Sequence, residues 1–384
     1  PRRGGAGGRA RAAVEGGTHQ RLGPDVALGR GGFADDTAPT DALVALRSVA
    51  GGWSVAPTLA EARRSSGKVQ GRRTTAPVGW PLQVPEPDGS DGDGPDGAGW
   101  ARSLRTTWVE PGYLEPDAAW ATPDGRSHGP LGNGGAFGGK VDSDIEQTAR
   151  GLAAVHGRPV RVLSTREDVV RIGPKRPPVA IGVHADGTGV VRVARTPGIA
   201  AAIAAIAPEV TVEEVDVVGP ATSASLRGAG WAEVAVVMSS LQPGPDDTVT
   251  SPDGAVATAR ITSDGAVSVR VRCGADPDDA GEAVVLRSYC IGAAHMALGW
   301  VRSEAIAVGD DGEPLDLTIR SFGILRAVDT PPIHVEIDAT DGPSPPVRLV
   351  AGADAVFAAV AAAAWRAAGF PAAWPLDAGP LDQG

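Results

Sequence analysis

With 384 residues, the chain is long enough to bury a large core and to form two lobes. Its formal net charge of −11 argues against a nucleic-acid partner, and the absence of a run of about 18 apolar residues predicts no membrane span. Only Cys273 and Cys290 occur, too few for a disulfide framework or an iron–sulfur cluster, and we expect a reducing cytoplasm.

Composition predicts a flexible segment followed by three lobes. Residues 1–27 are rich in glycine and arginine, which predicts a flexible N-terminal segment. The expected lobes are 28–130 (α+β, with an acidic Gly/Pro linker at 85–99), 131–245 (a glycine loop and an Arg-Gly motif) and 246–384 (α+β). The linker lacks the spacing and the final glutamate of an EF-hand, so a solvated loop is favoured over a calcium site.

The first lobe begins with glycines and a phenylalanine before paired acids, in Arg30–Asp36. A strand is expected over Ala42–Val49, and a short helix over Thr58–Arg64, where Glu61 stands three residues after Thr58 as in a capping box. A further strand is expected over Arg105–Val109, and the sequence EPGYLEP follows it.

A glycine-rich stretch, GNGGAFGGK, then occupies residues 132–140. Glycines allow backbone N–H groups to approach a ligand closely, and Asp142 or Ser143 can cap a helix expected over Val141–His156. A helix N-terminus behind such a loop suits a phosphate or a polar heterocycle, although the spacing is that of neither a Walker loop nor a dinucleotide fingerprint. A tight glycine turn is the structural alternative. The candidate ligand-binding residues are Gly134, Gly135, Phe137, Gly138, Gly139 and Lys140.

The motifs after this loop complete a pattern. A strand in Gly157–Val162, a short helix opening in Ser164–Asp168 and the run Lys175–Pro178 follow in order. Together with the loop, they resemble the molybdopterin-binding large subunit of the xanthine dehydrogenase/aldehyde oxidase (molybdenum hydroxylase) family. The resemblance implies an α+β fold of two lobes with mixed sheets and packed helices, a reduced version of the large-subunit fold. It also implies that the glycine–Phe–glycine loop lies against a molybdopterin cofactor.

The remaining chain alternates strands and helices. Strands are expected over Val179–His184, Gly189–Val193, Val210–Val218, 254–262, 265–273, Val301–Val308, Leu315–Arg320 and Pro331–Ile337. Helices are expected over Ile199–Ile206, from Trp231 through Leu241, over Pro277–Trp300 and over Ala353–Ala368, the last closed by Gly369.

A second motif precedes one of these helices. The sequence SLRGAGWAE at residues 225–233 resembles the family's second cofactor-proximal motif. We expect Arg227 and Gly228 to lie near the cofactor, where a guanidinium can hold an oxyanion or a phosphate. The alternative is an arginine that satisfies backbone carbonyl groups.

Three departures from the family pattern concern the chemistry. Only residues 122–131 separate two signatures that the family spaces widely, and the chain is roughly half as long as the usual subunit. The family's Gly-Gln-Gly loop is absent after the strand Val267–Cys273. The Gly-Glu pair before the last helix, whose glutamate is the family's general base, is also missing; Asp354 stands there and is expected to cap the helix. The catalytic residues are therefore unknown, and no side-chain metal site is predicted.

Three hypotheses follow. The chain is a reduced molybdenum-hydroxylase-type subunit that hydroxylates a small molecule at a molybdopterin site, with iron–sulfur and flavin subunits or a homologous subunit as partners. Alternatively, it is a cofactor-free relative that uses the old cleft on a small molecule, for example for a cyclisation. The third hypothesis is a non-catalytic scaffold subunit.

Overall fold

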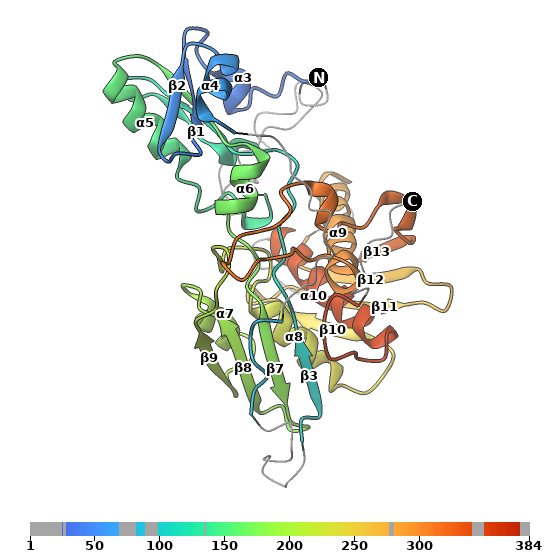
Figure 1. Cartoon of the computed structure of the whole chain (residues 1–384). Coiled ribbons are helices and arrows are strands. Elements are labelled where there is room, and N and C mark those ends of the chain that lie inside the picture. Colours follow the sequence, from blue (N-terminus) through green and yellow to red (C-terminus); the bar gives the residue numbers. More distant parts are fainter. Residues whose placement is uncertain are drawn as a thin grey trace. The chain divides into compact units, whose positions relative to one another are not determined.

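The structure is a computed structural model, and it describes residues 25, 28–68, 82–88, 99–133, 136–275, 280–339 and 349–376. The chain forms two compact units, each assembled from separate stretches (Figure 1). Unit 1 comprises Pro1–Arg73, Pro111–Pro174 and Asp316–Thr318, and unit 2 comprises Thr74–Glu110, Lys175–Leu315 and Ile319–Gly384. The lobe boundaries near residues 27, 130 and 245 remain predictions.

Unit 1 contains one mixed sheet with the strand order β2-β1-β6-β4-β5, in which β1 and β6 are parallel and the other neighbours antiparallel. Its strands are β1 (Leu43–Arg47), β2 (Trp53–Ala56), β4 (Ala118–Ala121), β5 (Ser127–His128) and β6 (Val160–Leu163). Its helices are α3 (Ala34–Thr37), α4 (Leu59–Ser66), α5 (Ile145–His156), α6 (Arg166–Ile172) and two 3₁₀ turns, Pro130–Asn133 and Ala136–Gly138.

Strand β1 explains why both faces of this sheet are covered. Because successive side chains alternate between faces, Leu43 and Ala45 pack with α5 while Val44 and Leu46 pack with α4. The sheet is therefore the middle layer between two helices, and the short apolar run of β1 is buried from both sides.

Unit 2 contains two four-stranded sheets. The order of the first is β3-β7-β8-β9, and that of the second is β10-β11-β12-β13 (Figure 1). The strands are β3 (Arg102–Arg105), β7 (Val179–Val183), β8 (Gly189–Ala194), β9 (Val210–Val215), β10 (Asp247–Thr250), β11 (Val256–Ile261), β12 (Val267–Arg272) and β13 (Ile333–Ile337). The helices are α7 (Ile199–Ala204), α8 (Trp231–Ser240), α9 (Ala280–Arg302), α10 (Leu349–Ala367) and the 3₁₀ turns Ile319–Ser321 and Ala327–Asp329.

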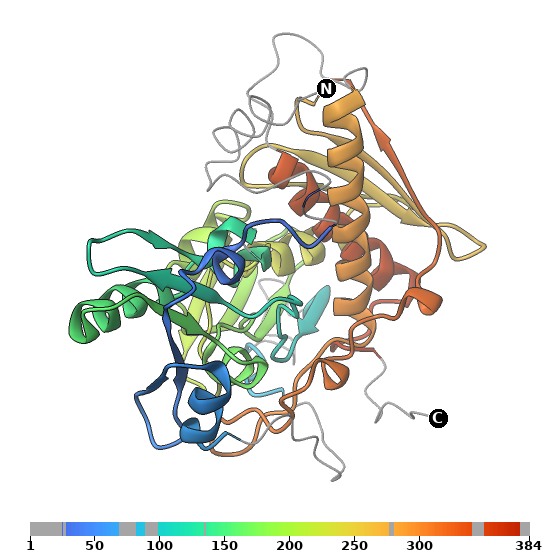
Figure 2. The same cartoon turned by 90° about the horizontal axis from the view of Figure 1, so that it is seen from above.

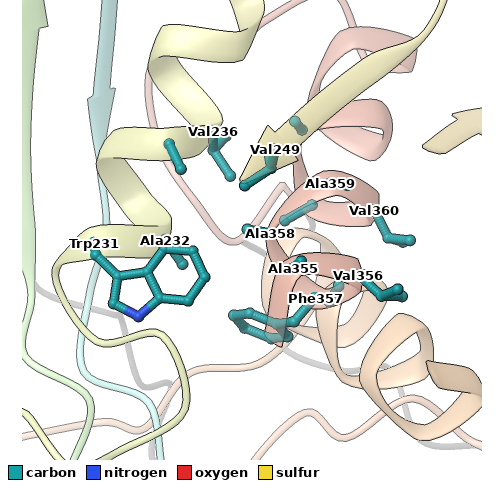
Figure 3. Close-up of a cluster of buried hydrophobic side chains, with 14 of the residues drawn as sticks. Trp231, Ala232, Val236, Val249, Ala355, Val356, Phe357, Ala358, Ala359 and Val360 are labelled. Carbon is teal, nitrogen blue, oxygen red and sulfur yellow. The ribbon is translucent and has the colours of Figure 1, made fainter. Parts of the chain in front are cut away.

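The second sheet is buried on one face only. Val267, Val269 and Val271 of β12 are buried, whereas Arg270 and Arg272, which point to the other face, are exposed. Helices α9 and α10 cover the buried side (Figure 2). Helix α10 also packs against α8, where Trp231 and Ala232 of α8 lie on the side of Phe357 and the α10 alanines (Figure 3). Alanines on α10 allow its neighbours to approach closely, so this helix is buried all round and forms the centre of the core.

Most of the elements expected in the first half of the chain are confirmed. Thr58 caps α4, and Thr165 caps α6 in a capping box with Asp168. The helix after the glycine loop is shorter than predicted, because residues 141–144 form turns and α5 begins at Ile145. The prediction of a cap by Asp142 or Ser143 is wrong, since Asp144 occupies the cap position without a side-chain hydrogen bond.

In the second half, the hairpin β7–β8 with its turn at Asp186-Gly187 and the hairpin β11–β12 are confirmed. The strands predicted over Val301–Val308 and Leu315–Arg320 are wrong. Helix α9 continues to Arg302, and the following backbone bonds to separate segments instead of to a sheet partner: Ala305 N–H donates to Phe322 and Ile306 N–H to Trp108.

Among the residues that the structure describes, two helices, α9 and α10, have the length and apolar composition of membrane-spanning helices. The core helix of a soluble protein meets the same description, and most of α10 is buried inside the protein. Its apolar character is therefore explained by packing.

Candidate functional site

The glycine loop of unit 1 contains unusual backbone geometry. Ala136 and Phe137 both have positive φ, 52° and 58°, and Gly138 follows with a φ of 95°. A non-glycine residue in this left-handed region costs about 1 kcal/mol or more, and such strain gathers at functional sites. The Phe137 side chain is also 41% exposed, so burial of its ring does not compensate for the strain. These observations favour a ligand-binding loop; the candidate residues Gly134 and Gly135 lie outside the described residues.

Behind the loop, Gly139 and Lys140 pack against Tyr113. A Cβ on Gly139 would lie 2.8 Å from a carbon of the Tyr113 ring, so this position requires glycine for internal packing. Lys140 is buried, with its ammonium 5.4 Å from the centroid of the same ring. Burial lowers the pKa of Lys140, and the negative charges of Asp117 and Glu115 oppose that shift.

Asp117 is a buried carboxylate beside this lysine. It accepts hydrogen bonds from the Tyr113 hydroxyl, at 3.2 Å, and from the Ser143 hydroxyl. Burial raises the pKa of Asp117, while these hydrogen bonds and the charge of Lys140 act in the opposite direction. The loop therefore rests on a buried polar group of Lys140, Tyr113 and Asp117. Sequence reasoning missed Tyr113 and Asp117, although both lie in or next to the EPGYLEP signature.

The Arg-Gly motif lies in unit 2, and its side chain is engaged within that unit. Arg227 Nε donates to Asp354 Oδ1 at 2.9 Å, and Arg227 Nη1 lies 3.4 Å from the sulfur of Met296. The prediction that Asp354 caps the last helix is wrong, because α10 begins at Leu349 and Asp354 lies inside it. Burial raises the pKa of Asp354, and Arg227 counteracts this shift.

Gly228 has a structural role that the geometry explains directly. Its φ is +66°, and a Cβ there would lie only 2.8 Å from the Cβ of Ala232 in the first turn of α8. Its carbonyl group accepts a hydrogen bond from Arg176 at 3.1 Å. A side chain at this position would therefore displace the start of α8.

Arg176 is the centre of this part of unit 2. Its Nε donates to Glu233 Oε1 at 2.7 Å, and Nη1 and Nη2 donate to the carbonyl groups of Arg227 and Gly228. The guanidinium lies 4.0 Å from the centroid of the Trp300 ring. The sequence presented Arg176 only as part of the run Lys175–Pro178, with no role. In the structure it is the residue that holds the Arg-Gly motif.

The neighbouring residue, Lys175, forms an ion pair with Glu110 at 2.9 Å, and both side chains are fully buried. Burial lowers the pKa of Lys175, and the charge of Glu110 opposes the shift. Glu110 is the last residue of unit 2 before the chain enters unit 1, and Lys175 is the first residue of unit 2 after the chain returns. The ion pair and the backbone bridge between Val109 and Arg176 therefore connect these two segments of unit 2.

The candidate residues thus divide between the units. Phe137, Gly138, Gly139 and Lys140 are in unit 1, and Arg227 and Gly228 are in unit 2. The assignment of these residues to cofactor binding stays a prediction. Within each unit, the motif is accompanied by buried charged groups that the sequence pattern did not identify.

No protein-family model matches the chain, and no curated protein matches it. Among solved structures, quinoline 2-oxidoreductase from Pseudomonas putida 86 aligns with a TM-score of 0.57 and 11% identity, covering 92% of this chain and 95% of the other. A reconstituted CO dehydrogenase from Oligotropha carboxidovorans aligns with a TM-score of 0.52 and 9% identity, covering 94% of this chain and 96% of the other. The chain therefore has the mixed α+β fold of these oxidoreductases.

Proposed function

We propose that the protein is a reduced subunit of the molybdenum hydroxylase type, an oxidoreductase that hydroxylates a small molecule at a molybdopterin site. The observation that carries the proposal is the strained, exposed loop Ala136–Gly138, which lies in the motif that resembles the family's cofactor loop. The fold supports the same reading, because its structural neighbours are oxidoreductases.

The loop fits such a cofactor in one respect. Ala136, Phe137 and Gly138 have positive φ, a conformation found in backbone turns that bind anions and polar groups, and Phe137 offers an exposed ring that a polar heterocycle can face. Arg227 fits less simply, because a phosphate would have to share its guanidinium with Asp354. When bound, the molybdenum–pterin group supplies two-electron oxidation, and the electrons would pass to iron–sulfur and flavin partners.

The first experiment is elemental analysis for molybdenum, with pterin fluorescence after denaturation, on protein purified from its native host. Near-stoichiometric amounts of both are expected. Their absence from the wild-type protein would contradict the proposal.

A substitution links the cofactor to the loop. In Phe137→Gly, we expect the fold to persist, since glycine adopts a φ of 58° without strain, but molybdenum and pterin content to fall at least tenfold. The matched control is Val155→Ala, which removes an apolar side chain that is 80% exposed on α5 of the same unit and should retain the wild-type content. Equal content in both variants would exclude a binding role for the Phe137 ring.

A second candidate is a cofactor-free relative, acting on a small molecule in the old cleft or serving as a scaffold subunit. Two observations favour it: the glutamate expected before α10 is absent, and Arg227 is already paired with Asp354. Wild-type protein without molybdenum or pterin would support this candidate. A screen for small-molecule binding would then separate an enzyme from a scaffold.

A further inference from the structure

Glu304 is a buried carboxyl immediately after α9. The backbone around it is fixed on both sides: Ser303 Oγ donates to the carbonyl group of Gly323 at 2.6 Å, and Ile306 N–H donates to that of Trp108 at 3.0 Å. Only 8% of the residue is exposed. The chain therefore holds this acid inside unit 2 at a defined position.

The end of α9 makes room for the carboxyl group. A Cβ on Gly299 would lie 2.0 Å from Glu304 Oε1, so the carboxyl group lies directly against the helix backbone where a side chain is missing. In the part of the chain that the structure describes, this carboxyl group makes no hydrogen bond. A buried acid without hydrogen-bond donors favours its neutral form.

Arg176 is the charged group that acts on Glu304, but it does so without a hydrogen bond. Its Nε, Nη1 and Nη2 donate to Glu233 and to the carbonyl groups of Arg227 and Gly228, and Glu304 receives only through-space attraction. Burial therefore outweighs this attraction and raises the pKa of Glu304 to about 8. Other charged side chains on the surrounding elements do not contribute to this shift: Glu110, Lys175, Arg302, Arg320 and Asp354.

Two polar atoms beside Arg176 point independently to a missing group. Glu233 Oε2 and Trp300 Nε1 are buried and have no hydrogen-bond partner among the described residues. Glu233 is bonded to Arg176 through its other oxygen, and the Trp300 ring lies under the guanidinium. An unsatisfied acceptor and an unsatisfied donor at one cluster suit a ligand edge that carries both an N–H or O–H and an acceptor atom.

We propose that Glu304 is the acid–base group of the Arg176 cluster, taking the proton-transfer role that the missing glutamate before α10 leaves vacant. In its neutral form, Glu304 donates a proton to an oxygen or nitrogen of a ligand beside Arg176: the acid O–H bond breaks, and a new O–H or N–H bond forms on the ligand. The carboxylate that remains is stabilised by the guanidinium, and the proton returns in the reverse step. The ligand part of this proposal rests on the proposed function.

The test of the proton itself is the pH dependence of unfolding of the wild type and Glu304→Gln, measured in denaturant between pH 5 and 9. Because the unfolded state releases this proton near pH 4.3 and the folded state only near pH 8, wild-type stability should fall as pH rises between these values. Glutamine mimics the neutral acid, so the ratio of the folding constants of variant and wild type should rise about tenfold per pH unit, up to about pH 8.

The control is Glu336→Gln, which changes an exposed acid on β13 of the same unit. The ratio of its folding constant to that of the wild type should vary with pH far less. If the Glu304→Gln and wild-type curves run parallel, Glu304 does not hold a proton at neutral pH and the proposal is overturned. This measurement requires no cofactor, so it decides about the proton even if the wild type contains no molybdenum.

A second readout concerns the ligand. Wild-type and Glu304→Gln proteins that carry molybdenum and pterin are dialysed at pH 6.5 and pH 9. The molybdenum and pterin contents are measured afterwards. If Glu304 donates to the bound group, wild-type protein that is still folded at pH 9 should lose cofactor there, because the carboxylate can no longer donate, while Glu304→Gln should retain it at both values. Equal loss from the two proteins would overturn the ligand role, whereas a wild type without molybdenum would overturn the proposed function.

Discussion

The buried pair of Lys175 and Glu110 allows a quantitative test of how unit 2 is stabilised. Both side chains are fully buried and 2.9 Å apart, a distance at which two unit charges attract by about 6 kcal/mol at an effective dielectric constant of about 20. Desolvation costs several kcal/mol for each ion, so the intact pair adds little net stability. Removing one partner is different, because it leaves an uncompensated charge inside the protein.

We therefore expect Lys175→Met and Glu110→Gln each to lower the free energy of unfolding by about 3–5 kcal/mol, and the double variant to lose far less than the sum. Urea denaturation followed by tryptophan fluorescence measures all four proteins. Glu110→Gln has a further signature. Without the opposing carboxylate, the pKa of Lys175 falls further below that of the unfolded state, so this variant should regain stability as pH rises towards about 10.

Single-variant losses below about 1 kcal/mol that add up in the double variant would refute this reasoning. They would mean that water reaches the pair or that the surrounding chain relaxes. A Glu110→Gln variant whose stability did not change with pH would show that the pKa of Lys175 is the same in the folded and unfolded states, so that the lysine keeps its charge without Glu110.

Two further predictions use features elsewhere in unit 2. A Cβ on Gly219 would lie 2.1 Å from the buried ring of Trp108, so Gly219→Ala should destabilise by about 1–3 kcal/mol. The control is Gly292→Ala, in the interior of α9 with open space around it, which should stabilise the protein by up to about 1 kcal/mol. A higher melting temperature for Gly219→Ala than for Gly292→Ala would contradict the geometry. Burial raises the pKa of Cys290 to about 12, so a thiol reagent at pH 8 should modify half-buried Cys273 first and reach Cys290 only after denaturation. Rapid modification of both cysteines in the native protein would exclude the burial of Cys290.

Local signals in the sequence predicted much of the fold. The cap of α6 follows from Thr165 and Asp168, which are three residues apart, and the hairpin β7–β8 follows from alternating apolar residues around Asp186-Gly187. Both depend on neighbours in the chain. The physics that determines them is therefore contained in a short window of sequence.

The polar clusters could not be predicted in the same way. Arg176 meets Glu233, and Arg227 meets Asp354, only after distant segments have packed together. No spacing rule connects such residues, because sheet order and helix packing decide which of them become neighbours. Asp354 illustrates this: as a helix-proximal acid it suggested a cap, but an earlier start of α10 turned it towards Arg227.

The central position of α10 also affects the order in which unit 2 can fold. The partners of this helix, β10 to β12, α8 and α9, all precede it in the chain, and their apolar faces meet on its alanine-rich surface. Until residues 349–367 have left the ribosome, the parts of those faces that α10 covers remain exposed, and they present an aggregation-prone surface. Docking of α10 joins contacts that are distant in sequence, which is a slow type of step. A nascent chain paused before Leu349 should consequently depend on a chaperone, and completion of the helix should release it.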